Sequence, residues 1–114
     1  VERDEQWKLA RFRFSGGELW VPDPGLPLSV STRVRVQARD VSLSLEAAQQ
    51  SSILNSLPAL VESVEENDDA MALVKLRLGE SILSARVSRR SVAELGVQSG
   101  MALFAQVKSV AILR

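Results

Sequence analysis

The sequence predicts an all-β protein built from two β-modules, with one short helix. Hydrophobic residues recur mainly at every second position, which is the period of a half-buried strand rather than of a helix. Gly and Pro gather between these alternating segments, where turns are needed. The chain has 114 residues, of which 46% are hydrophobic and 25% charged, an ordinary globular composition that allows a buried core.

A β-hairpin is predicted near the start of the chain. Residues 11–14 alternate Arg and Phe, so that both Phe lie on one face and both Arg on the other. Gly16-Gly17 interrupts this segment, and residues 18–21 resume the strand, which is typical of a hairpin with a Gly-rich loop. Residues 22–27 contain Pro and Gly and are expected to form a loop.

A long strand is expected over residues 33–45. Its apolar residues change parity between Ala38 and Val41, so they cannot all face one side of a regular strand. The change predicts a bulge or a bend near Arg39-Asp40.

The chain is expected to divide at the polar segment 46–50. Residues 1–50 would form an N-terminal β-module, a partial barrel with a linker at its start, and residues 51–114 a second domain. In the second domain, alternation predicts strands at residues 57–64, 70–78, 82–87, 103–108 and 110–113.

One helix of about two turns is expected between the strands of the second domain. The run from Ser91 to Glu94 has the capping-box pattern of a helix start, and Ser88 is a rival N-cap. Gly96 is a natural residue at which the helix ends.

The two modules show a faint internal similarity. A duplication and the chance similarity of alternating strands explain it equally well. In a duplication Asp40 would stand at the position of Ser109, and because a carboxylate repels an anion, only the second module would bind one. The aligned segments are 37–43 with 106–112 and 11–15 with 75–79.

Composition excludes several classes of function. The chain has no Cys and no His, which removes thiol and imidazole catalysis, disulfides and zinc sites built from these residues. Its 14 Lys and Arg balance 14 Asp and Glu, so a basic footprint for nucleic acid is missing. No Lys follows a Gly, so the chain lacks a P-loop, is expected not to hydrolyse ATP, and offers no catalytic residues. No apolar run approaches the ~20 residues that span a bilayer, so direct membrane insertion is not expected.

Two charged clusters have plain structural interpretations. The acidic residues 65–69 lack the spacing of a calcium loop, so we interpret them as a solvated hairpin tip and predict no metal-cation site. A row of four Arg with two Trp nearby is a possible nucleic-acid surface, but the two Phe opposite it are interpreted as core. These residues are Arg11, Arg13, Arg33, Arg35, Trp7 and Trp20.

Lys108-Ser109 interrupts the apolar pattern of the last strand. A Lys buried there would need a partner, and a small oxyanion is one candidate. An ammonium group with hydroxyl and backbone N–H donors suits a tetrahedral dianion. Ser52, Ser88 and Ser109 supply the available hydroxyls, although spacing alone does not bring them together. The alternative is an edge-strand Lys that reaches solvent beside a Ser at a bulge.

Three stretches of the second domain resemble the mop, or TOBE, domain. They are residues 52–58, which begin Ser-Ile-Leu-Asn, residues 88–97 and residues 106–110. Residues 19–21 and 33–43 resemble the region that precedes this domain in the ATP-binding subunits of molybdate ABC importers. The resemblance covers nearly the whole chain from about Leu9.

The resemblance implies an OB-like, five-stranded Greek-key barrel with a partial barrel upstream. It implies a regulatory domain that homodimerises and binds molybdate or tungstate at a subunit interface, without a cofactor. The implied oxyanion-binding residues are Ser52, Ser88, Lys108 and Ser109. The family often has Arg where this chain has Leu54, so one donor and one positive charge are missing.

The resemblance also implies partners and a location. The partners would be a second copy, the ATPase domain of an ATP-hydrolysing parent transporter subunit, and the importer's membrane subunits. The location would be the cytoplasm, at the inner face of the cell membrane through the parent transporter. Two alternatives are a purely structural dimerisation domain without a ligand, which Leu54 favours, and a nucleic-acid-binding OB-like barrel, against which the neutral charge argues.

Overall fold

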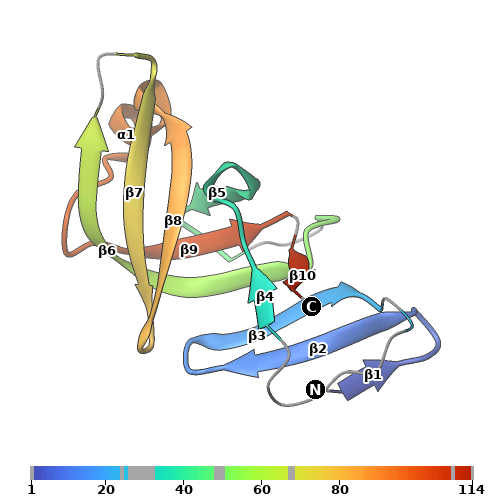
Figure 1. Cartoon of the computed structure of the whole chain (residues 1–114). Helices are drawn as coiled ribbons and strands as arrows, with labels where there is room; N and C mark the ends of the chain where they lie inside the picture. Colours follow the sequence, from blue (N-terminus) through green and yellow to red (C-terminus); the bar gives the residue numbers. More distant parts are fainter. Residues whose placement is uncertain are drawn as a thin grey trace.

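The described part of the chain folds into three antiparallel sheets with one short helix, which confirms the all-β prediction (Figure 1). The computed structural model describes residues 2–23, 25, 33–47, 51–66, 69–108 and 110–113. The elements are β1 (Glu2–Asp4), β2 (Leu9–Phe14), β3 (Gly17–Pro22), β4 (Arg33–Arg35), a 3-10 turn η1 (Ala38–Asp40), β5 (Val41–Ser44), β6 (Asn55–Glu66), β7 (Met71–Leu78), β8 (Ser81–Ser88), α1 (Arg89–Leu95), β9 (Ala102–Val107) and β10 (Ala111–Leu113).

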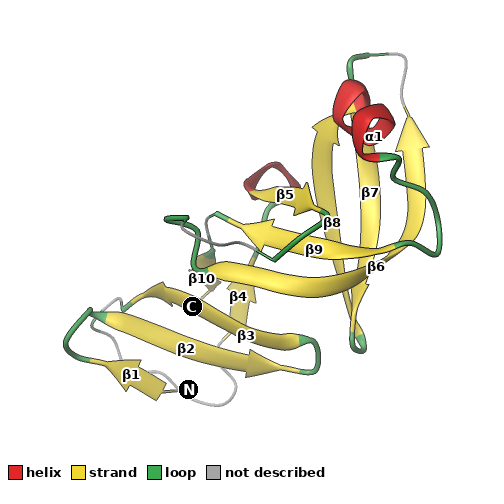
Figure 2. Cartoon of the chain, turned by 180° about the vertical axis from the view of Figure 1, so that it is seen from behind, coloured by secondary structure: helices red, strands yellow, loops and turns green. Residues whose placement is uncertain are grey.

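The largest sheet has five strands in the order β5-β9-β6-β7-β8. It curls so that β5, at one edge, approaches β8, at the other (Figure 2). The long strand β6 takes part in both halves of the curl, pairing with β9 through its first residues and with β7 through its later ones. A register shift between Val61 and Ser63 lies within the β6–β7 ladder, just beyond Leu60, the last residue that pairs with β9, and is a place where the strand can bend. The OB-like barrel architecture expected from the sequence is confirmed.

The main core lies inside the curled sheet and follows from strict alternation. Along β7, Val74, Leu76 and Leu78 are buried whereas Lys75 and Arg77 between them are exposed. The same alternation places the inward residues of β6 and β9 in one apolar cluster. Full burial of each such side chain contributes roughly 1.5–3 kcal/mol, so period-two patterning decides which face points inward.

The N-terminal hairpin is confirmed as β2 and β3, joined at Ser15-Gly16. With β1 it forms a three-stranded sheet that lies beside the curled sheet, with β4 and β10 between the two (Figure 1). Phe12 is buried in a small cluster with Ala10 and Val21, as the core interpretation of the Phe face predicted.

The expected long strand over residues 33–45 is wrong, although the position of its interruption is right. The 3-10 turn η1 divides it into β4 and β5, which belong to different sheets. β4 pairs with β10, and β5 pairs with β9. The parity change therefore marks the point where the chain leaves one sheet for another rather than a bulge within one strand.

The helix begins three residues before the capping-box position. Ser88 is its N-cap, and the Ser88 hydroxyl accepts a hydrogen bond from the Ser91 backbone N–H at 3.0 Å. Of the two predicted N-caps, Ser88 and not Ser91 caps the helix, because Ser88 is the last residue of β8 and has the extended backbone that an N-cap requires. Gly96 ends the helix in the left-handed conformation, with φ of 67°, as predicted.

The turns of two hairpins pack directly against each other. A Cβ added to Gly16 would lie 2.3 Å from the Leu78 carbonyl oxygen, so only glycine fits there. The Ser15 hydroxyl accepts from the Glu80 N–H at 3.0 Å and lies 3.1 Å from the Ser81 hydroxyl oxygen. This contact joins the three-stranded sheet to the curled sheet at one end.

The two hairpins also share one register. Leu9 pairs with Pro22 in the first hairpin, and Leu73 pairs with Arg86 in the second, which matches the sequence offset of 64. A duplication predicts this agreement. The division of the chain at residue 50 stays a prediction; β4 and β5, which precede it, pair with β10 and β9, which follow it.

Candidate functional site

A pocket of about 540 Å³ lies where β3, the start of β6 and the end of β9 meet. It brings together two of the expected site residues, Ser52 and Lys108, with Leu54 beside them. The complete lining is Leu9, Trp20, Pro22, Ser52, Ile53, Leu54, Asn55, Val107 and Lys108.

Strand register explains why these residues meet. Asn55 and Val107 form the last pair of the β6–β9 ladder, so Leu54 and Lys108 are the next positions beyond the ends of the two strands. The Lys108 backbone N–H donates to the Asp40 carbonyl oxygen at 2.8 Å, which fixes this residue on its other side. Lys108 is therefore held by its backbone at the rim of the sheet.

The side chain of Lys108 is exposed, as in the alternative of a Lys that reaches solvent and not one buried within the last strand. The reason is that β9 ends at Val107, so Lys108 has already left the sheet. The ammonium group stays hydrated, and burial does not force it to find a partner. Its position in the pocket wall, rather than burial, is what makes it available to an anion.

Ser88 lies away from this pocket. It is half-buried at the start of α1, which sits at the opposite end of the curled sheet from the start of β6 (Figure 2). Its hydroxyl oxygen is also 2.8 Å from that of Ser91. One chain therefore does not bring Ser88 together with Ser52 and Lys108. Ser109 lies outside the described residues.

Asn55 and Trp20 are parts of the site that sequence reasoning missed. Asn55 is the one buried polar side chain in the described core, and both ends of its amide bond the Trp20 backbone. Its Nδ2 donates to the Trp20 carbonyl oxygen at 2.8 Å, and its Oδ1 accepts from the Trp20 N–H at 2.7 Å. The signal was an Asn at an inward-facing strand position, where a polar side chain must find partners.

Trp20 is one of the residues that line the pocket. The guanidinium carbon of Arg11 lies 5.7 Å from the centroid of its ring, within cation–π range. Arg11 forms ion pairs with Glu2 and Glu18, and Arg13 pairs with the same two carboxylates. These two members of the expected basic row are therefore neutralised locally, which weakens the nucleic-acid alternative.

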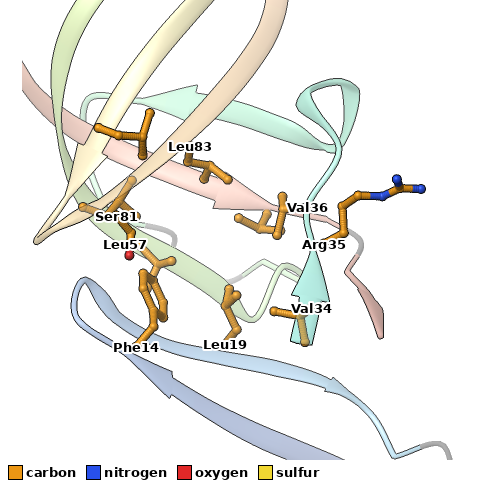
Figure 3. Close-up of a pocket in the computed structure, with 11 residues that line it drawn as sticks. Phe14, Leu19, Val34, Arg35, Val36, Leu57, Ser81 and Leu83 are labelled. Carbon is orange, nitrogen blue, oxygen red and sulfur yellow. The ribbon is translucent and has the colours of Figure 1, made fainter. Parts of the chain in front are cut away.

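A second cavity, of about 360 Å³, separates the β2–β3 hairpin from the curled sheet (Figure 3). Phe14, Leu19, Val34 and Leu57 gather around it, while the charged end of Arg35 extends away. Within the described ranges, no three Asp or Glu side chains come together as metal ligands, and no helix is long and apolar enough to cross a membrane. This cavity offers apolar contact but little acid–base chemistry.

Comparison with known protein families gives a match over the second half of the chain. The family model described as the TOBE domain matches residues 51–113. The chain belongs to the TOBE domain family. The match contains all four residues expected to bind oxyanion, whereas Leu9 and Trp20 of the pocket precede it. The pocket is thus built jointly by the TOBE domain and the sheet before it.

The similar curated proteins are molybdenum import ATP-binding proteins named ModC. The protein from Methylococcus capsulatus is 48% identical over 113 residues, covering 98% of this chain and 32% of that protein. The one from Thiobacillus denitrificans is 48% identical over 112 residues, covering 97% and 31%. This TOBE domain chain spans about a third of the length of these relatives.

A solved structure shares the fold. It is the cytoplasmic molybdate-binding protein ModG, in a crystal form with molybdate bound. The TM-score is 0.62 and the sequence identity 27%, over 70% of this chain and 57% of that chain. The resemblance to mop and TOBE domains stated from the sequence is confirmed.

Proposed function

We propose that this TOBE domain is the regulatory, oxyanion-binding part of the ATP-binding subunit of a molybdate importer. The observation that carries the proposal is the pocket whose lining includes both Lys108 and Ser52. The names of the ModC relatives and the molybdate bound to ModG support molybdate or tungstate as the ligand. The ligand is an anion, and the domain itself needs no cofactor.

In the proposed site, one group supplies the positive charge and other groups supply the directional hydrogen bonds. Lys108 supplies the positive charge, and hydroxyls supply directional donors that a tetrahedral oxyanion can accept. We assign Asn55 a supporting role, because both ends of its amide bond the Trp20 backbone and so hold the pocket wall. One ammonium group leaves part of a dianion's charge uncompensated, which favours a site completed by further groups.

A second copy of the chain would complete this site. Ser88 cannot reach Ser52 within one chain, so in the proposed homodimer it comes from the partner, and Ser109 adds a further hydroxyl. Binding at an interface couples the ligand to assembly, because the oxyanion then stabilises one arrangement of the pair over another. The attached ATPase domains would follow that arrangement, at the cytoplasmic face of the importer's membrane subunits. In this proposal the whole protein hydrolyses ATP and this domain restrains it when molybdate is abundant.

A structural dimerisation domain without a ligand is the second candidate. The observation in its favour is Leu54, whose side chain is 60% exposed in the pocket where the family often has Arg. It predicts self-association that does not depend on molybdate.

Calorimetric titration of the chain with molybdate, with sulfate as the control anion, separates the two. The oxyanion function predicts micromolar, molybdate-selective binding of about one ion per chain. Lys108→Ala should abolish this binding, whereas Lys75→Ala, which removes an exposed Lys from β7, should not. Unchanged affinity after Lys108→Ala would remove Lys108 from the site, and absence of binding by the unaltered chain would leave the structural candidate.

A further inference from the structure

A smaller cavity adjoins the oxyanion pocket and shares part of its apolar lining. This neighbour, of about 240 Å³, is lined by Asp4, Trp7, Leu9, Trp20 and Leu54. The two cavities share three of these residues, Leu9, Trp20 and Leu54. We call these two adjoining cavities together the tryptophan trough.

The two ends of the tryptophan trough differ in charge. Lys108 and Ser52 line only the larger cavity, and Asp4 lines only the smaller one, where its carboxylate accepts from the Trp7 N–H at 3.2 Å. Leu9, Trp20 and Leu54 line both. An anion entering the trough therefore has one favourable place for its charge, beside Lys108, and is repelled from the far end.

The apolar wall offers an inorganic oxyanion few hydrogen-bond donors. A dianion that leaves water needs donors, and indole and leucine side chains do not replace its hydration. The trough leaves large apolar side chains in water: Trp7 is 67% exposed and Leu54 is 60% exposed. An apolar body lying between them would remove both surfaces from water, which is the usual source of affinity in small-molecule sites.

The wall is also prepared for such a body. Asn55 fixes the backbone of Trp20 through two hydrogen bonds, and Arg11 lies over the indole ring. Arg11 is not part of the lining of either cavity, and its charge is directed to Glu2 and Glu18. A ring that is already held in place loses little freedom when a ligand stacks on it.

We propose that the tryptophan trough binds an aromatic monocarboxylate. The carboxylate lies beside Lys108 and Ser52, and the flat apolar body lies along Trp20 and Leu54 towards Trp7. Asp4 rejects a second carboxylate at the far end. This inference does not rest on the oxyanion function, although the two ligands would compete for Lys108.

Three related probes test charge and orientation. Calorimetric titration with 2-naphthoate should show binding, and the neutral analogue 2-naphthalenemethanol should bind about tenfold more weakly because it lacks the charge-assisted contact with Lys108. 2,6-Naphthalenedicarboxylate, which places a second charge at the far end, should also bind more weakly than 2-naphthoate. Equal binding of 2-naphthoate and its alcohol, or no binding of either, overturns the proposal.

Variants separate this ligand from molybdate. Trp7→Ala should weaken 2-naphthoate binding several-fold and leave molybdate binding unchanged, because Trp7 belongs to the apolar end alone. Trp7→Phe should restore most of the affinity, since it keeps an aromatic face. Ile82→Ala, which shortens a 52% exposed side chain in the other cavity, is the matched control and should change neither ligand.

Molybdate binding and 2-naphthoate binding test the two proposals independently. Thermal unfolding of each variant shows that the fold is kept. Absence of molybdate binding by the unaltered chain would refute the oxyanion function and leave this inference standing. Unchanged 2-naphthoate affinity after Trp7→Ala would refute this inference and leave the oxyanion function standing.

Discussion

The side-chain amide of Asn55 bonds both backbone groups of Trp20, donating to the carbonyl oxygen at 2.8 Å and accepting from the N–H at 2.7 Å. The side-chain amide of Asn55, on β6, thereby pairs with the Trp20 backbone, on β3, as a peptide group of a neighbouring strand would. It joins the three-stranded sheet to the curled sheet, at the wall of the pocket that holds Lys108. Stability of the fold and shape of the site therefore depend on the same side chain.

Replacing Asn55 with Ala should lower the free energy of unfolding by about 2 kcal/mol or more. The change leaves the Trp20 N–H and carbonyl without these partners, and each unsatisfied buried group costs roughly 1–3 kcal/mol. Chemical denaturation measures the loss. Gln98→Ala, which removes an exposed amide from a turn, is the control and should stay within about 0.5 kcal/mol. A stability equal to that of the unaltered chain would show that the two bonds contribute nothing.

Replacing Gly16 with Ala should destabilise the protein by about 2 kcal/mol or more, because the new methyl group overlaps the Leu78 backbone in the contact between the two turns. Gly79→Ala should be at least as damaging, since its φ is +62° and its Cβ would lie 2.4 Å from the Ser15 carbonyl oxygen. Gly100→Ala is the matched control: its φ is +88° but the space around it is open, so only the backbone cost of about 1 kcal/mol remains. Thermal unfolding of the three variants gives the order, and equal losses would contradict the role of the turn contact.

Two substitutions of Ser88 should separate its capping role from its proposed ligand role. Ser88→Ala removes the N-cap of α1 and should cost about 0.5–2 kcal/mol of stability. Ser88→Asp keeps an acceptor for the Ser91 N–H, so stability should be retained, while the added carboxylate should repel a bound oxyanion. Denaturation and molybdate titration of both variants check this. Normal molybdate binding by the Asp variant would exclude Ser88 from the site.

Replacing Leu54 with Arg should raise molybdate affinity by about tenfold, because the guanidinium group adds charge and donors at the position in register with Lys108. Calorimetry against the unaltered chain measures the gain. Leu60→Arg adds the same charge at a 48% exposed position outside the pocket and should leave the affinity unchanged. An equal gain in both variants would indicate general attraction rather than a site.

The local parts of the fold were predictable because local patterns determine them. Alternation located both hairpins, and Ser88 and Gly96 marked the ends of the helix that the structure shows. The division of residues 33–45 between two sheets was not predictable, because alternation gives the face of a strand but not its neighbour.

The candidate site was likewise predictable only in part. The family resemblance named Ser52 and Lys108, and the structure places both in one pocket. Their binding of an oxyanion stays a prediction. The bonds between Asn55 and Trp20 join residues that are far apart in sequence and lie in different sheets, so no local pattern indicates them. Spacing left the exposure of Lys108 open between two alternatives, and the end of β9 at Val107 decides for the exposed side chain.

Strand sharing across residue 50 has a consequence for how this protein can be cut. A fragment that begins at residue 51 would keep every position of the TOBE match but lose β4 and β5, leaving β9 and β10 with bare edges. Such edges invite pairing with other molecules, so we expect the fragment to aggregate. The segment that matches the family is thus smaller than the set of strands that pair with one another in the fold.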